Sequence, residues 1–167
     1  TIGLQMDCDT TGVEPDFAMV KFKKLAGGGN FKIVNLAVPK ALKKLGYTET
    51  EMHEIIEYAV GTGTLDNAPA ISRETLRTKG LTDTEIDRIN KELPGTFDIR
   101  YALNPLTVGL ETYERLGFTE KAKDQSFDFL ASLGFTNQEI EEANKTICGT
   151  MTIEGAPHHK KEHLPVF

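Results

Sequence analysis

The sequence has only two cysteines, no hydrophobic run of membrane-spanning length and no surplus of basic residues. Cys8 and Cys148 are separated by most of the chain, so a disulfide framework is not expected and the reducing cytoplasm is the predicted location. No stretch approaches the roughly 20 apolar residues that a membrane helix requires. The net charge of -6 opposes the phosphate backbone of nucleic acid, which is therefore not an expected partner.

What the sequence does contain is enough apolar material for one domain with a core, with 39% hydrophobic residues among 167. No initiator methionine precedes Thr1, and we expect the chain to be a piece of a larger protein. Residues 2–6 predict a buried strand, and residues 7–12 predict a polar turn. Pro15 then suits the start of a helix that ends at the glycine run 27–29. The residues at helical spacing within it are Phe17, Val20 and Lys24.

One short phrase, a glycine, an apolar residue and a threonine, recurs four times and predicts helical corners. Glycine suits the left-handed conformation after a helix, and threonine can cap the helix that follows. A glutamate three residues later predicts a capping box at three of the four corners, whereas Thr119 is followed by Ala122. The pairs are Thr48–Glu51, Thr82–Glu85 and Thr136–Glu139, and the glycines are Gly46, Gly80, Gly117 and Gly134.

Apolar residues recur at helical spacing after these corners, so the predicted fold class is mainly α: a bundle of short capped helices with a short N-terminal strand. Further helices are predicted over residues 38–45, 72–79, 105–116 and 126–133. The stripes predicted to form the core are Met52, Ile55, Ile56 and Ala59; Ile86, Ile89 and Leu93; and Ile140, Ala143 and Ile147.

A longer repeat overlies these corners. Residues 45–76 match residues 133–164 at a constant offset of 133 - 45 = 88, sharing Leu-Gly-aromatic-Thr, the capping glutamate, Gly-Thr-x-Thr, Ala-Pro and a closing Glu-x-Leu. This pattern predicts an internal duplication that inserted a second helix-and-loop unit. The predicted organisation is one domain, 1–167, divided into a leading segment 1–44, copy 1 at 45–76, intervening helices at 77–132 and copy 2 at 133–167.

The segment Asp7-Cys8-Asp9-Thr10-Thr11 matches the D-x-D-x-T pattern of haloacid-dehalogenase-like phosphatases. In those enzymes one aspartate attacks phosphorus and the other acts as acid and base beside a magnesium ion. The chain lacks the paired acidic motif and the second parallel strand that this fold needs. A turn capped by the aspartates is the favoured interpretation.

The segment His159-Lys160-Lys161-Glu162-His163 matches the H-x-x-E-H pattern of zinc peptidases. Pro157 and Pro165 leave too little room for the long helix of such a site. The corresponding residues of the first copy, Ile71 and Thr75, are not metal ligands. A solvated basic turn is the favoured interpretation.

Two further patterns could indicate binding sites, and each also has a purely structural interpretation. Lys21, Lys23 and Lys24 beside the glycine run could cradle a phosphate, but the spacing is not that of a P-loop, and lysines on an outer helix face are favoured. Leu133-Gly134-Phe135-Thr136 resembles the exposed loop of helical ubiquitin-binding modules, which makes a non-catalytic interaction module an alternative. Both cysteines are interpreted first as small buried residues.

Longer blocks carry a family resemblance. MDCDTTGVEPDFAMVKFKKLAGGG, the following FKIVN, and EGAPHHKKEHLPVF at the far end resemble the large chain of adenosylcobalamin-dependent (class II) ribonucleotide reductases. In that family the first block follows a Pro-Thr-Gly-Thr-Ile loop that holds the substrate phosphate, and Thr1-Ile2 match its last two residues. The resemblance implies a parent ribonucleoside-diphosphate reductase that makes deoxyribonucleotides for DNA synthesis by radical chemistry initiated by adenosylcobalamin.

The same resemblance implies which residues bind substrate. The catalytic cysteines, carboxylate and asparagine of the family lie elsewhere in its barrel, so no catalytic residue or metal ligand is assigned here. The isolated chain is therefore expected to be inactive and not to bind the cofactor alone. The implied substrate-binding residues are Thr1, Ile2 and Gly3 in the phosphate loop, and Thr10, Thr11, Gly12, Val13, Glu14 and Pro15 in the adjoining wall.

Shorter members of the family pass from the first Leu-Gly-Tyr-Thr unit directly to the Glu-Gly-Ala-Pro ending. This implies that residues from about 61 to 150 are a helical insertion within or beside the reductase α/β barrel. The implied partners are the remainder of the reductase chain, the ribonucleotide substrate and a thiol reductant such as thioredoxin, with a homo-oligomer left open. Nucleic acid and membrane are not expected partners.

Overall fold

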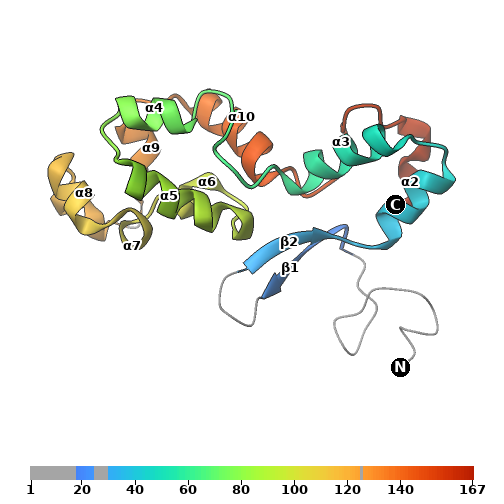
Figure 1. The fold of residues 1–167 in the computed structure, drawn as a ribbon, viewed down its shortest axis with the longest axis horizontal. Helices are drawn as coiled ribbons and strands as arrows, with labels where there is room; N and C mark the ends of the chain where they lie inside the picture. The colour runs from blue at the N-terminus through green and yellow to red at the C-terminus, as the bar shows by residue number, and fades with distance from the viewer. Residues whose placement is uncertain (1–17, 25–29, 125) are drawn as a thin grey trace. The chain divides into compact units, whose positions relative to one another are not determined.

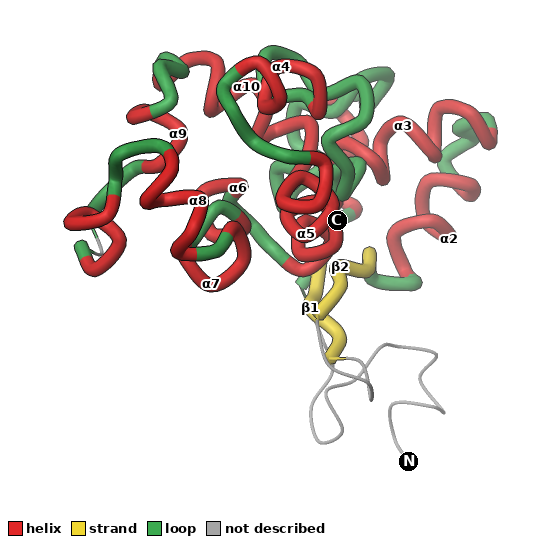
Figure 2. The backbone as a smooth tube through the Cα atoms, turned by 60° about the vertical axis from the view of Figure 1, so that its left-hand side comes forward, coloured by secondary structure: helices red, strands yellow, loops and turns green. Residues whose placement is uncertain are grey.

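The computed structural model describes residues 18–24, 30–124 and 126–167, and this part of the chain is mostly helical, as predicted (Figures 1 and 2). The chain divides into two compact units. Unit 1 comprises Thr1–Gly61 and Gly149–Phe167, and unit 2 comprises Thr62–Cys148. None of the described helices is both long enough and apolar enough to cross a membrane. The strand predicted over residues 2–6 lies outside the described residues.

The described part of unit 1 contains an antiparallel hairpin where the sequence predicted a helix. Strand β1 (Val20–Lys24) pairs with β2 (Asn30–Val34), with Val20 opposite Val34. The prediction from Pro15 to the glycine run is therefore wrong over residues 20–24. The apolar spacing was compatible with a helix, but the second strand supplies backbone partners and cross-strand contacts that a local pattern does not include.

Two helices and the C-terminal segment complete unit 1. Asn35 leads into α2 (Ala37–Lys44), its side-chain Oδ1 accepting a hydrogen bond from the amide of Ala37 at 3.0 Å. Helix α3 (Glu49–Val60) begins at the predicted Thr48–Glu51 capping box, and the chain ends in the short 3-10 helix η3 (Lys161–Val166). The buried core of this unit is Val20, Val38, Leu42, Tyr47, Met52, Ile55, Ala59, Ile153 and Ala156; Ile56 is only partly buried against it.

Unit 2 is built from short helices joined by tight corners (Figure 1). The predicted helix over 105–116 is interrupted at Gly109, whose φ of +103° breaks it into two pieces. The helix predicted over 126–133 is shorter, because Asp128 caps it. The elements are α4 (Arg73–Thr78), α5 (Asp83–Glu92), η1 (Leu93–Gly95), α6 (Ile99–Ala102), α7 (Pro105–Val108), α8 (Leu110–Arg115), η2 (Thr119–Lys123), α9 (Phe129–Ser132) and α10 (Asn137–Cys148).

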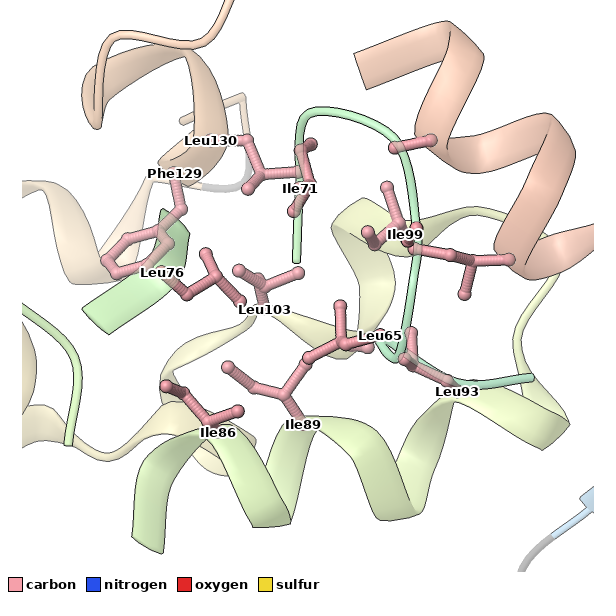
Figure 3. Close-up of a cluster of buried hydrophobic side chains, with 14 of the residues drawn as sticks. Leu65, Ile71, Leu76, Ile86, Ile89, Leu93, Ile99, Leu103, Phe129 and Leu130 are labelled. Carbon is pink, nitrogen blue, oxygen red and sulfur yellow. The ribbon is translucent and has the colours of Figure 1, made fainter. Parts of the chain in front are cut away.

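The core of unit 2 is aliphatic at its centre and aromatic at one side. In Figure 3 the side chains of Leu65, Ile71, Ile89 and Leu103 point toward one another, and Phe129 lies beside Leu76. The capping boxes at Thr82–Glu85 and Thr136–Glu139 form as predicted. At Thr119, which lacks the glutamate, only the 3-10 turn η2 forms, without a side-chain cap.

Residues 88 apart have matching backbone conformations in the two predicted copies. Positive φ values are uncommon outside glycine, yet three of the matching pairs include a residue other than glycine. The pairs are Gly46 (+87°) with Gly134 (+89°), Gly61 (+80°) with Gly149 (+76°), Gly63 (+65°) with Met151 (+62°), Asn67 (+59°) with Gly155 (+81°), and Ala70 (+57°) with His158 (+61°).

Candidate functional site

The residues predicted to bind substrate all fall within residues 1–17, which lie outside the described residues. These are Thr1, Ile2, Gly3, Thr10, Thr11, Gly12, Val13, Glu14 and Pro15, and Asp7, Cys8 and Asp9 of the phosphatase-like motif lie there too. They therefore stay predictions. Among the described residues, polar side chains gather in a tyrosine–histidine cluster in unit 1 and in an ion-pair network around Glu85 in unit 2, and unit 2 also has a cavity.

The tyrosine–histidine cluster joins the corner before α3 to the C-terminal segment. The hydroxyl of Tyr47 lies 2.8 Å from Nδ1 of His163 and accepts a hydrogen bond from the amide of Lys160 at 2.9 Å. Its ring stacks on His159, with centroids 6.1 Å apart, and meets the edge of His163. The H-x-x-E-H segment was predicted to be a solvated turn, and its two histidines are instead packed against Tyr47.

The arrangement of this cluster, and not its charge state, argues against a zinc site. Burial, together with nearby His163, lowers the pKa of His159, so the neutral ring is favoured. Its Nε2 is enclosed without a hydrogen-bond partner among the described residues, and Glu162 is exposed. Nowhere in the described ranges do three His, Cys, Asp or Glu side chains form a group that could hold a metal ion. The cluster is therefore a packing contact.

Removing the Tyr47 hydroxyl is expected to destabilise unit 1. Tyr47→Phe keeps the ring but leaves the Lys160 amide and His163 without their partner, which should cost about 1–2 kcal/mol in the free energy of unfolding. Tyr58→Phe is the matched control, because the Tyr58 hydroxyl makes only a long, exposed hydrogen bond of 3.4 Å to Glu154 O. Urea unfolding followed by circular dichroism measures the stability of both variants. Equal losses of stability would contradict the role assigned to the Tyr47 hydroxyl.

The ion-pair network in unit 2 surrounds Glu85, whose side chain is only 11% exposed. Both carboxylate oxygens lie 2.8 Å from Nη2 of Arg115, and one of them accepts from the amide of Thr82 at 2.8 Å. The hydroxyl of Thr112 also donates to this carboxylate. The sequence predicted Glu85 as a capping residue but missed Arg115, which is 30 residues away. All of these contacts are internal, so the network stabilises the fold.

A cavity of about 640 Å³ opens between the α6–α7 corner and the segment before α9. Its wall includes Arg100, whose guanidinium lies 2.8 Å from Asp128 and 3.3 Å from Asp98. Tyr113 also lines it, donates a hydrogen bond to Leu103 O at 3.2 Å, and has a pKa that burial raises to about 12. The Arg100 charge is thus already compensated by protein carboxylates. Among the described residues, no histidine or cysteine lines this wall.

The cysteine, the phenylalanine loop and the lysines considered as binding features have structural positions. Cys148 is buried as predicted, with its Sγ 3.7 Å from the hydroxyl of Thr96. Phe135 is only 8% exposed and packs in the core beneath the Lys79 ammonium group, so the exposed loop of the interaction-module alternative is wrong there. Lys21 and Lys23 lie on β1 and not on a helix.

Comparison with known proteins identifies the family. A family profile described as "Ribonucleotide reductase, barrel domain" matches residues 1–85, which is half of the chain. The chain belongs to the ribonucleotide reductase family. The family's barrel profile therefore covers the leading segment with β1, β2 and α2, then α3, α4 and the first residues of α5.

Relatives of this ribonucleotide reductase segment are similar over its whole length or over part of it. Proteins named vitamin B12-dependent ribonucleotide reductase are 59% identical in Bradyrhizobium diazoefficiens and 54% identical in Agrobacterium fabrum, each over 100% of this chain. The chain spans only 14% and 13% of the length of those relatives. A relative with the same name in Streptomyces coelicolor is 53% identical over 74 residues, or 44% of this chain and 8% of the relative.

Proposed function

We propose that this chain is a segment of a vitamin B12-dependent ribonucleotide reductase, an enzyme that converts ribonucleotides, as diphosphates, to deoxyribonucleotides. The observation that carries this proposal is the 59% identity over the entire chain with a relative of that name. Adenosylcobalamin would initiate the radical chemistry in the parent enzyme, which we place in the cytoplasm with thioredoxin or a similar thiol as reductant. A homo-oligomer is compatible with this function.

In this proposal the leading residues contribute to the substrate pocket. Thr1, Ile2 and Gly3 would form the end of the phosphate loop, where a hydroxyl and backbone N–H groups can hold an anion. The stretch from Thr10 to Pro15 would form the adjoining wall. The described residues would support this edge without taking part in chemistry, and we assign no radical or redox role to Cys148, which is buried in the unit 2 core.

We further propose that residues from about 61 to 150 are a helical insertion created by internal duplication. The matching φ values 88 residues apart support a common origin of the two copies. The Streptomyces relative, which matches less than half of the chain, is consistent with a form that lacks the insertion.

The described residues do not fit a cobalamin site. The cavity of unit 2 is lined by paired aspartate and arginine side chains and by aromatic rings, with no histidine or thiol to approach cobalt. In unit 1, His158 is paired with Glu54, and His163 is bonded to Tyr47. We therefore assign cofactor binding to the rest of the parent enzyme and derive no step through it.

The substrate-loop proposal predicts a binding defect in the full-length parent enzyme. Thr1→Ala removes a hydroxyl donor to the substrate phosphate, so KM for the ribonucleoside diphosphate should rise about tenfold while kcat changes little. Thr119→Ala is the control, because Thr119 is exposed in unit 2 and makes no cap. Steady-state reduction assays test both variants. An unchanged KM in Thr1→Ala, or turnover by the isolated 167-residue chain, would contradict the proposal.

A further inference from the structure

The end of α3 is closed by the loop of the other copy. In unit 1 the amide of Thr150 donates to Tyr58 O at 3.0 Å, and the amide of Met151 donates to Ala59 O at 2.9 Å. Helix α3 belongs to copy 1, whereas residues 150 and 151 belong to copy 2. The loop that follows α3 in the sequence, residues 62–72, belongs to unit 2 instead.

Unit 2 contains the reciprocal arrangement. There the amide of Thr62 donates to Thr146 O at 2.9 Å, and the amide of Gly63 donates to Ile147 O, also at 2.9 Å. The donors Thr62 and Gly63 are equivalent to residues 150 and 151 of copy 2 (62 + 88 = 150; 63 + 88 = 151). The acceptors at 146 and 147 are equivalent to residues 58 and 59 of copy 1 (146 - 88 = 58; 147 - 88 = 59). The same pair of hydrogen bonds therefore closes both helices, each time with a loop from the opposite copy.

We propose that the two copies have exchanged their loops within one chain, so that each helix-and-loop module is assembled from both copies. This inference rests on the proposed duplication and not on reductase activity. The exchange points are Gly61 and Gly149, where the chain passes from one unit to the other. The backbones come so close there that a Cβ on Gly149 would lie 2.4 Å from Ala59 O and 2.5 Å from Gly61 N.

Backbone hydrogen bonds alone do not select the exchanged arrangement. If each helix kept its own loop, Thr62 could donate to Tyr58 O, four residues earlier, which is ordinary helical spacing. Both arrangements would therefore offer the same number of closing hydrogen bonds. The choice must come from side chains that differ between the copies.

The side chains of unit 1 favour the exchange. Glu54 on α3 pairs with His158 of the copy 2 loop at 2.8 Å, and the equivalent residue of the copy 1 loop is Ala70 (158 - 88 = 70), which cannot pair. Tyr47 likewise contacts His163, whose equivalent is Thr75 (163 - 88 = 75). The copy 1 loop would lose both contacts on α3.

The side chains of unit 2 favour the same choice. Ile71 and Leu76 of the copy 1 loop and its helix α4 are completely buried in the unit 2 core (Figure 3). Their equivalents in copy 2 are His159 and Leu164 (71 + 88 = 159; 76 + 88 = 164). Placing His159 at the site of Ile71 would bury an imidazole in an aliphatic core, which is unfavourable without hydrogen-bond partners.

Cysteine cross-linking in the full 167-residue chain tests the exchange. Four equivalent positions serve, two on the helices (Glu54 and Glu142) and two on the loops (Ala70 and His158). With Cys8→Ser as background and Cys148 kept, because it is buried, double cysteine variants are treated at low protein concentration with a short bismaleimide. Cross-copy pairs 54/158 and 142/70 should cross-link within the monomer, roughly tenfold or more faster than within-copy pairs 54/70 and 142/158.

Every outcome of the cross-linking experiment either supports or overturns the loop exchange. Faster reaction of the within-copy pairs, or equal rates, would overturn the proposal, and cross-linked dimers from the 54/158 pair would show exchange between two chains instead of within one. None of these results bears on the substrate-loop proposal. NMR of the unmodified chain gives a second test that requires no substitution. Cross-relaxation between the Tyr47 ring and the rings of His159 and His163 is expected, and its absence in the folded chain would also overturn the exchange.

Discussion

Gly149→Ala is expected to unfold unit 1. The new Cβ would lie 2.4 Å from Ala59 O and 2.5 Å from Gly61 N, which are backbone atoms that cannot rotate away. The φ of +76° at this position adds strain for any residue with a side chain. Together these effects should lower the free energy of unfolding by about 3–5 kcal/mol, as a severe overpacking change combined with backbone strain. The closing hydrogen bonds from Thr150 and Met151 follow directly after this glycine and should be lost with it.

Gly46→Ala separates backbone overlap from backbone strain as causes of the lost stability in Gly149→Ala. Gly46 has a similar φ of +87°, but an added Cβ would meet no atom within 4 Å. This variant should therefore lose only the conformational part, about 1–2 kcal/mol. Urea unfolding followed by circular dichroism compares them, with backbone amide exchange of α3 reporting on unit 1 directly. If the two variants were equally destabilised, the close backbone approach at Gly149 would be refuted.

Glu85→Gln is expected to lower the free energy of unfolding by about 2–3 kcal/mol at neutral pH, because it weakens the contacts with Arg115, Thr82 and Thr112. Burial alone would raise the pKa of Glu85, but the hydrogen bonds from Thr112, Thr82 and Arg115 outweigh it and hold the pKa below the ordinary value of 4.5. The carboxylate thus stabilises the fold at pH values above 4.5.

The pH dependence of this loss has a definite sign. As the pH falls below 4.5 and through the lowered pKa of folded Glu85, the wild-type carboxyl gains a proton and its stabilising contribution disappears. The stability difference between wild type and Glu85→Gln should therefore shrink with acidification. Glu51→Gln and Glu139→Gln are matched controls from exposed capping boxes and should lose less at neutral pH. A pH-independent difference for Glu85→Gln, measured by urea unfolding, would contradict this account.

Local sequence signals correctly predicted most of the helices. The three capping boxes and the absence of a capping box at Thr119 depend on residues within four positions of one another, and they agree with the structure. The threonine cap expected at Thr119 does not form. The helix expected over residues 20–24 was wrong because β2 supplies its hydrogen bonds from outside that window. The exposed Phe135 of the interaction-module alternative was wrong, because the unit 2 core covers this side chain.

The candidate site followed from family resemblance and not from local chemistry. Thr1 to Gly3 and Thr10 to Pro15 carry no pattern that predicts phosphate binding without the longer blocks around them. The structure describes none of these residues, so their assignment stays a prediction. The partner of Glu85 was also beyond prediction, because Arg115 is distant in sequence and any of several basic residues could have served.

The sequence by itself determined the short capped helices, the repeat at an offset of 88 and the family, because caps, corners and long blocks are encoded by neighbouring residues. Only the tertiary structure decided that β1 is a strand and that the segment after Gly149, not the segment after Gly61, closes α3. Two similar loops offer the same backbone donors to that helix. Long-range contacts such as Glu54–His158 and Tyr47–His163 distinguish them, and no local pattern contains those contacts.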